Sequence, residues 1–269
     1  MSQESCTRSY VTRTDVWALG ITTVIGGQYF IWNTGLEAGL GSYCIATLLV
    51  GCAYCCLCLC ASEISSTLPF AGGAYGLARC TLGYYPGYMI GCFESLQYII
   101  YVSTSVTFLS SMIVSETSLF QPLVWVCLYG STLAIHIKGG SLLWRFNLVI
   151  AILSILLLIV YCGGSLAFVD IAENLTLNMD PLNPYFNAGI FMFIRHIPTA
   201  SSFFLGVQSL NLASDEVANP KTDIPYGQMS AMMTLFATAI LVLFITVSLP
   251  QNNEISSQNV PLNTGNLNY

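Results

Sequence analysis

Two otherwise apolar segments of the sequence are each interrupted by glycine with a glutamine one or two positions later. The first segment, GITTVIGGQYFIWNTGL, contains Gly26, Gly27 and Gln28, and the second, IPTASSFFLGVQSLNLASDE, contains Gly206 and Gln208. A membrane helix that breaks at such a point frees backbone groups and half-helix dipoles, which can then bind a polar solute. For either segment alone, ordinary glycine packing is the alternative. The matched pair predicts noncovalent binding of a solute rather than covalent chemistry.

A carboxylate lies inside a third apolar segment, GCFESLQYIIY, at Glu94. A charge in lipid is costly unless it faces the interior of a helix bundle or water, so function is the default interpretation. Gln97, Tyr98 and Tyr101 follow at three, four and seven positions, which places them on one face of a helix. We therefore predict a pathway or gating role for Glu94, Tyr98 and Tyr101. A protonated acid satisfied by a neighbouring helix is the alternative.

Metal and catalytic chemistry find little support in the sequence. Six of the 11 cysteines fall in GSYCIATLLVGCAYCCLCLCAS, where Cys52 and Cys55 have metal-ligand spacing, but no His or second cysteine pair follows at a usable distance. Cysteine is also a small hydrophobic residue that suits helix contacts in lipid. The apolar segments contain no paired His ligands, Ser–His–Asp set or phosphate-binding loop. We predict no metal, no cofactor and no enzymatic activity.

Composition places these segments in a membrane. Hydrophobic residues make up 55% of the 269 positions and charged residues 7%, whereas soluble proteins are about a quarter charged. Such a chain cannot cover a water-facing surface, so the lipid bilayer must be its main solvent, and no basic run suggests nucleic acid. Because about 20 apolar residues cross a bilayer, we predict spans near 16–36, 41–62, 86–114, 122–137, 146–164, 191–214 and 226–249.

Basic residues in short loops predict the orientation of these spans. With the N-terminus in the cytoplasm, Arg195 alone falls outside, and the cytoplasmic set is Arg8, Arg13, Arg79, Lys138, Arg145 and Lys221. The loop at 165–190 is then extracellular, and it carries the glycosylation acceptor Asn174. We therefore predict a multi-pass protein, located in the plasma membrane, with a cytoplasmic N-terminus.

Two longer motifs resemble the amino acid–polyamine–organocation permeases. ASEISSTLPFAGGAYGLARCTLG (61–83) is similar to the end of helix 2 and the reentrant loop of that family, and SDEVANPKTDIPYG is similar to its link into helix 7. GGQYFIWNTGLEAG and GCFESLQYIIY look most like the ethanolamine permease branch. The resemblance extends to about Leu249. It implies an all-α membrane fold of five-plus-five inverted repeats with discontinuous helices 1 and 6, here truncated after helix 7.

The resemblance also implies a division of the chain. It comprises a cytoplasmic segment (1–15), a first repeat (16–164), an extracellular loop (165–190), an incomplete second repeat (191–249) and a polar disordered tail (250–269). No helix 8 or 10 is present to close the substrate cavity. The chain is therefore expected to be a fragment or short form of a transporter, or a product with another role.

Substrate-binding residues follow from the same resemblance. The unwound segments of helices 1 and 6 match Gly26, Gly27, Gln28, Phe204, Gly206, Val207 and Gln208. Family members commonly have Glu where this chain has Gln208, and Gln cannot exchange a proton. Glu63 matches the Glu that ends helix 2 and is a further gating candidate, with structural pairing to Arg79 or Lys221 as the alternative.

The function implied is a secondary transporter that moves amino acids, or a small amine such as ethanolamine, by alternating access. H⁺ or Na⁺ is the expected coupling ion. A truncated, non-transporting homologue that acts as partner or regulator of a full-length permease is the alternative. A seven-helix receptor is excluded by orientation, because Arg8 and Arg13 hold the N-terminus inside.

Overall fold

The computed structural model describes residues 11–31, 34–35, 40–67, 72–116, 120–165 and 189–247. These residues form helices and no named strand, which confirms the predicted all-α class. In chain order the elements are α1 (Arg13–Val24), α2 (Gly26–Phe30), α3 (Leu40–Thr67), α4 (Gly73–Thr81), α5 (Tyr84–Glu116), α6 (Gln121–Lys138), α7 (Gly140–Ser165), α9 (Gly189–Ser201), the 3₁₀ helix η3 (Val207–Ala213) and α10 (Pro220–Val247). Most of the predicted extracellular loop, with Asn174, and the polar tail lie outside the described residues.

Each predicted span corresponds to a helix or to a pair of helices. Among the residues that the structure describes, four helices are long and apolar enough to cross a membrane: Gly41–Thr67, Tyr84–Val114, Gly140–Ser165 and Pro220–Ile245. The first and sixth predicted spans are divided, into α1 with α2 and into α9 with η3, so neither contains one long helix. α6, with 18 residues, is shorter than these four helices. Prediction by apolar length therefore located the helices of the seven spans, including those that are interrupted, but not α4, which lies between the second and third spans.

Helix ends follow local backbone chemistry. Pro122 lies in the first turn of α6, where a missing N–H costs no hydrogen bond. Gly139 and Gly140 then have φ of 54° and 57°, a region that glycine enters without steric cost. The chain can therefore leave α6 and begin α7 without an intervening loop.

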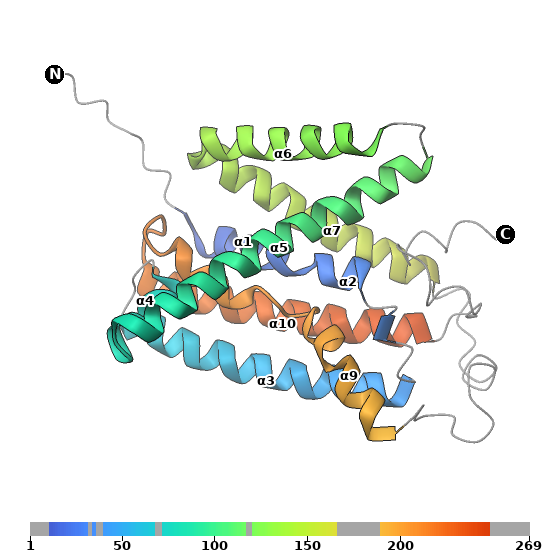
Figure 1. Cartoon of the computed structure of the whole chain (residues 1–269), viewed down its shortest axis with the longest axis horizontal. Coiled ribbons are helices and arrows are strands. Elements are labelled where there is room, and N and C mark those ends of the chain that lie inside the picture. The colour runs from blue at the N-terminus through green and yellow to red at the C-terminus, as the bar shows by residue number, and fades with distance from the viewer. Residues whose placement is uncertain are drawn as a thin grey trace.

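The centre of the bundle is formed by α10 with α1 on one side and α3 on the other (Figure 1). In the most apolar window of α10, 44% of residues are buried, against 6% for α5, so α10 is central and α5 peripheral. Close contact between α1 and α10 depends on small residues. A Cβ added to Gly20 would lie 2.6 Å from the Cβ of Ala231, and one added to Gly227 would lie 2.5 Å from Val16. Small residues at helix contacts are typical of membrane proteins, because they allow backbones to approach.

Candidate functional site

The interruption of the first span and that of the sixth span lie against each other. A Cβ added to Gly27 would lie 2.0 Å from the backbone oxygen of Ser202, and one added to Gly206 would lie 2.9 Å from Cγ2 of Thr23. Position 23 thus faces 206 and position 27 faces 202, so the two segments run antiparallel. The backbones are in direct contact at Gly27, and no other residue type fits there without displacing one of them.

The first interruption is short and falls one residue before the predicted glycine pair. Ile25 separates α1 from α2, and Gly26 and Gly27 are the first residues of α2. The N–H of Gln28 donates to the oxygen of Ile25 at 3.0 Å, a three-residue spacing in place of the α-helical four. At this point the helix therefore has a single tighter turn with 3₁₀ spacing, and it is not unwound over several residues.

The second interruption is longer. α9 ends at Ser201, residues 202–206 form turns, and η3 begins at Val207. Gly206 has a φ of 113°, which L-residues with a side chain rarely adopt. Its N–H donates to Oε1 of Gln208 at 3.1 Å, so this predicted binding residue supports the backbone of its own break.

Two buried glutamines connect both interruptions to α10. Gln28 is fully buried, and its side-chain amide donates to the backbone oxygen of Leu235 at 3.0 Å. Gln228 of α10, also fully buried, donates to the oxygen of Val207 at 3.3 Å. Within the described part of the chain, the amide oxygens of both glutamines have no hydrogen-bond partner. Sequence reasoning missed Gln228, although an amide within the seventh apolar segment was a visible signal.

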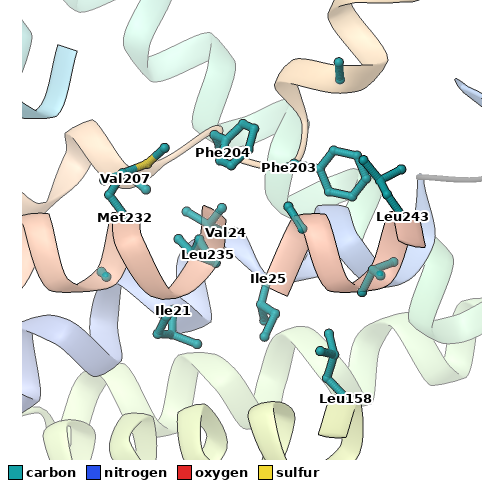
Figure 2. Close-up of a cluster of buried hydrophobic side chains, with 14 of the residues drawn as sticks. Ile21, Val24, Ile25, Leu158, Phe203, Phe204, Val207, Met232, Leu235 and Leu243 are labelled. Atoms are coloured by element: carbon teal, nitrogen blue, oxygen red, sulfur yellow. The ribbon is translucent and has the colours of Figure 1, made fainter. Parts of the chain in front are cut away.

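Phe204 and Val207 face the apolar core. Both are fully buried, and Figure 2 shows them close to Val24, Met232 and Leu235. The ring centroid of Phe204 lies 5.9 Å from that of Tyr54 on α3 and 6.1 Å from that of Phe236 on α10. The aromatic face of Phe204 is therefore engaged between α3 and α10.

The predicted polar stripe of α5 faces the interruptions. The hydroxyl of Tyr101 donates to the backbone oxygen of Thr23 at 2.5 Å, just before the break between α1 and α2. One turn away, the hydroxyl of Tyr98 bonds to Oε1 of Glu94 at 3.3 Å and also contacts the side chain of Ser209 in η3. The structure thus brings Tyr101, Tyr98 and Glu94 together with the residues of both breaks.

Glu63 is not part of this assembly. Its side chain is exposed in the last turns of α3, and its backbone oxygen accepts hydrogen bonds from Ser66 and Thr67. Among the described residues no three His, Cys, Asp or Glu side chains gather in a metal-binding arrangement.

Polar contacts close the end of the bundle at which the described chain begins. Nε of Arg13 lies 2.7 Å from Oδ1 of Asp223, at the start of α10, and the guanidinium lies over the ring of Tyr226. Nε1 of Trp144 on α7 donates to Glu216 at 2.8 Å. The first of these contacts joins α1 to α10, and the second joins α7 to the segment between η3 and α10.

Comparison with known proteins identifies relatives along nearly the whole chain. The profile described as amino acid permease matches residues 12–266. An uncharacterized transporter of Rhizobium meliloti is 27% identical, with 92% of this chain and 54% of the relative aligned. The methylthioribose transporter of Bacillus subtilis is 28% identical (87% and 53%), and the branched-chain amino acid permease of the same organism is 26% identical (87% and 52%). The chain therefore spans about half the length of these relatives, which are transporters and not enzymes.

Proposed function

Because the chain belongs to the amino acid permease family, we propose that it acts in the secondary transport of amino acids, or of a small amine such as ethanolamine, across the plasma membrane. The proposed mechanism is alternating access in a five-plus-five inverted-repeat fold. Relatives named for a branched-chain amino acid and for methylthioribose support a small polar solute as substrate. H⁺ or Na⁺ would drive the transport.

One observation carries this proposal: the antiparallel contact of the two interrupted spans at Gly27 and Ser202. Interrupted helices that meet inside a membrane protein place free backbone groups where a polar solute can replace its hydration. Side chains from α5 add hydroxyl groups beside both interruptions: Tyr101 at Thr23 and Tyr98 at Ser209. Gly26, Gly27 and Gln208 would hold the polar head of the solute, and Tyr98 and Tyr101 would line its path.

Uptake into proteoliposomes tests the proposal directly. Purified chain would be reconstituted and supplied with radiolabelled ethanolamine, leucine or alanine, with a Na⁺ gradient, a proton gradient or neither. Accumulation driven by one gradient, and abolished by an ionophore that collapses it, is expected. Equal signals from protein-containing and empty liposomes, for every solute and gradient, would contradict the proposal.

A second candidate, partnership with a full-length permease, is favoured by the exposure of α5. Only 6% of its most apolar window is buried, and the face that carries Glu94 and Tyr98 is partly open. Further helices could pack there. Co-expression with a full-length permease of the same cells separates the candidates: a partner changes that permease's uptake and shows none alone.

The predicted topology also belongs to this proposal. It has a cytoplasmic N-terminus and an extracellular loop at 165–190 that carries Asn174. Glycosylation mapping would find Asn174 modified from the lumenal side, and labelling of the loop from the cytosol would contradict the assignment.

A further inference from the structure

Glu94 is a carboxylate without a cationic partner among the described residues. It lies in the third turn of α5, a helix that is long and apolar enough to cross a membrane. In the part of the chain that the structure describes, the one ion pair joins Arg13 to Asp223. An ionisable side chain within a membrane span is costly and normally finds a cation, a proton or water.

The surroundings of Glu94 orient its carboxylate toward η3 and α4. Tyr98 donates to Oε1 and also contacts Ser209, so the carboxylate is linked to η3 through one tyrosine. A Cβ added to Gly73, at the start of α4, would lie 3.4 Å from the same oxygen. Gly73 has a φ of 52°, which favours glycine, and a Cβ there would also lie 2.7 Å from Cδ2 of Leu212, so only glycine allows the start of α4 to lie this close to the carboxylate and to η3.

Glu94 lies within reach of a solute held at the interruptions. The hydroxyl of Tyr101 lies beside the first interruption, because it bonds to the backbone oxygen of Thr23 and lies 3.9 Å from a Cβ added to Gly26. Tyr98 and Glu94 precede Tyr101 by three and seven residues, which at the helical rise is about 4.5 and about 10.5 Å along α5. A chain of three or four carbons with a charged end can span much of this separation, and the Glu side chain can span the rest.

We propose that Glu94, oriented by Tyr98, forms a subsite for the positively charged end of the transported solute. This inference rests on the proposed function and extends it by naming a substrate class: solutes with an ammonium or guanidinium group on a chain of three or four carbons. Their polar head lies at Gly26 and Gly27, and their charged end reaches Glu94. A short amine such as ethanolamine cannot occupy both positions at once.

Glu94 lies beside the start of α4, so its carboxylate could instead have a structural role. A negative charge near a helix N-terminus is stabilising, so Glu94 could simply support the first turn of α4. Glu94→Gln separates the two roles, because glutamine keeps an acceptor oxygen of nearly the same shape and removes the charge. A purely structural carboxylate would alter the binding of neutral and cationic solutes alike.

Binding of labelled lysine and leucine to the full chain in lipid nanodiscs provides the test. Lysine should bind more tightly than leucine, and Glu94→Gln should weaken lysine binding about tenfold or more, since hydrogen bonds between charged groups are the stronger ones. Leucine binding and the thermal midpoint should stay the same. Tyr98→Phe should weaken lysine binding less. Ser95→Ala, on the neighbouring exposed face where the hydroxyl bonds only to Gly91, is the control.

Three results would overturn the inference. Equal binding of lysine and leucine, unaffected by Glu94→Gln, would remove the subsite and leave the proposed function in place. Parallel loss of both solutes in Glu94→Gln and Tyr98→Phe would assign both side chains a structural role. If the unmodified chain bound neither lysine nor leucine, the result would also contradict the proposed transport of amino acids.

Discussion

Two adjacent glycines at the first interruption should differ in how well they tolerate substitution by alanine. A Cβ on Gly27 would lie 2.0 Å from the oxygen and 2.8 Å from the carbonyl carbon of Ser202. A Cβ on Gly26 would meet only the hydroxyl of Tyr101, at 3.9 Å, which is an ordinary contact. Gly27→Ala therefore forces two backbones apart, whereas Gly26→Ala fills open space.

The size of the effect follows from these contacts. Overfilling a packed site typically costs about 1–3 kcal/mol, and 1.4 kcal/mol corresponds to about a tenfold change in an equilibrium constant. Since Gly27→Ala displaces the break itself, solute uptake should fall about five- to 150-fold. Gly26→Ala introduces a better helix former into α2, a gain of up to about 1 kcal/mol, so its thermal midpoint should not fall.

Uptake of labelled leucine into proteoliposomes would measure the effect of Gly27→Ala on transport, and thermal midpoints would compare the two variants. Thermal unfolding in detergent reports whether Gly27→Ala still folds, and labelled-solute binding in nanodiscs reports on the site without the transport cycle. Normal uptake by Gly27→Ala, or an equal fall of the thermal midpoint in both variants, would refute the argument that the contact with Ser202 matters.

Other substitutions probe the second break, the polar stripe and the closed end of the bundle. Gln208→Glu keeps the acceptor for the N–H of Gly206 and adds an ionisable group, so uptake measured across pH should vary more than in the parent; an identical pH profile would contradict this. Tyr101→Phe removes the hydrogen bond to Thr23 and should lower stability by about 1 kcal/mol in thermal unfolding. A double-mutant cycle between Arg13→Ala and Asp223→Asn should give a coupling of no more than about 1 kcal/mol that shrinks with added salt, because Arg13 is 55% exposed.

Local signals in the sequence located the helices of the seven spans, and they placed the first interruption to within one residue. Apolar length located the spans, and the glycines at 139 and 140 ended one helix and began the next. The breaks were also visible, since Gly206 has a backbone conformation that favours glycine and Gly27 lies where no side chain fits. These features depend on a few neighbouring residues, so a single sequence carries them.

Partners of the polar side chains were decided by tertiary structure. In a helix that faces lipid, apolar residues surround the whole circumference, so periodicity does not mark the face that meets a neighbour. The sequence alone therefore could not place Phe204 between α3 and α10, or pair Gln28 with Leu235 and Gln228 with Val207.

Gly26 and Gly27 show the same division between sequence and structure. Both residues are glycine, and the sequence predicted the same role for both. Only the antiparallel approach of the sixth span, which brings a backbone oxygen to one glycine and open space to the other, distinguishes them. The chain determines where its helices can break, and the packing of distant segments determines what each break contacts.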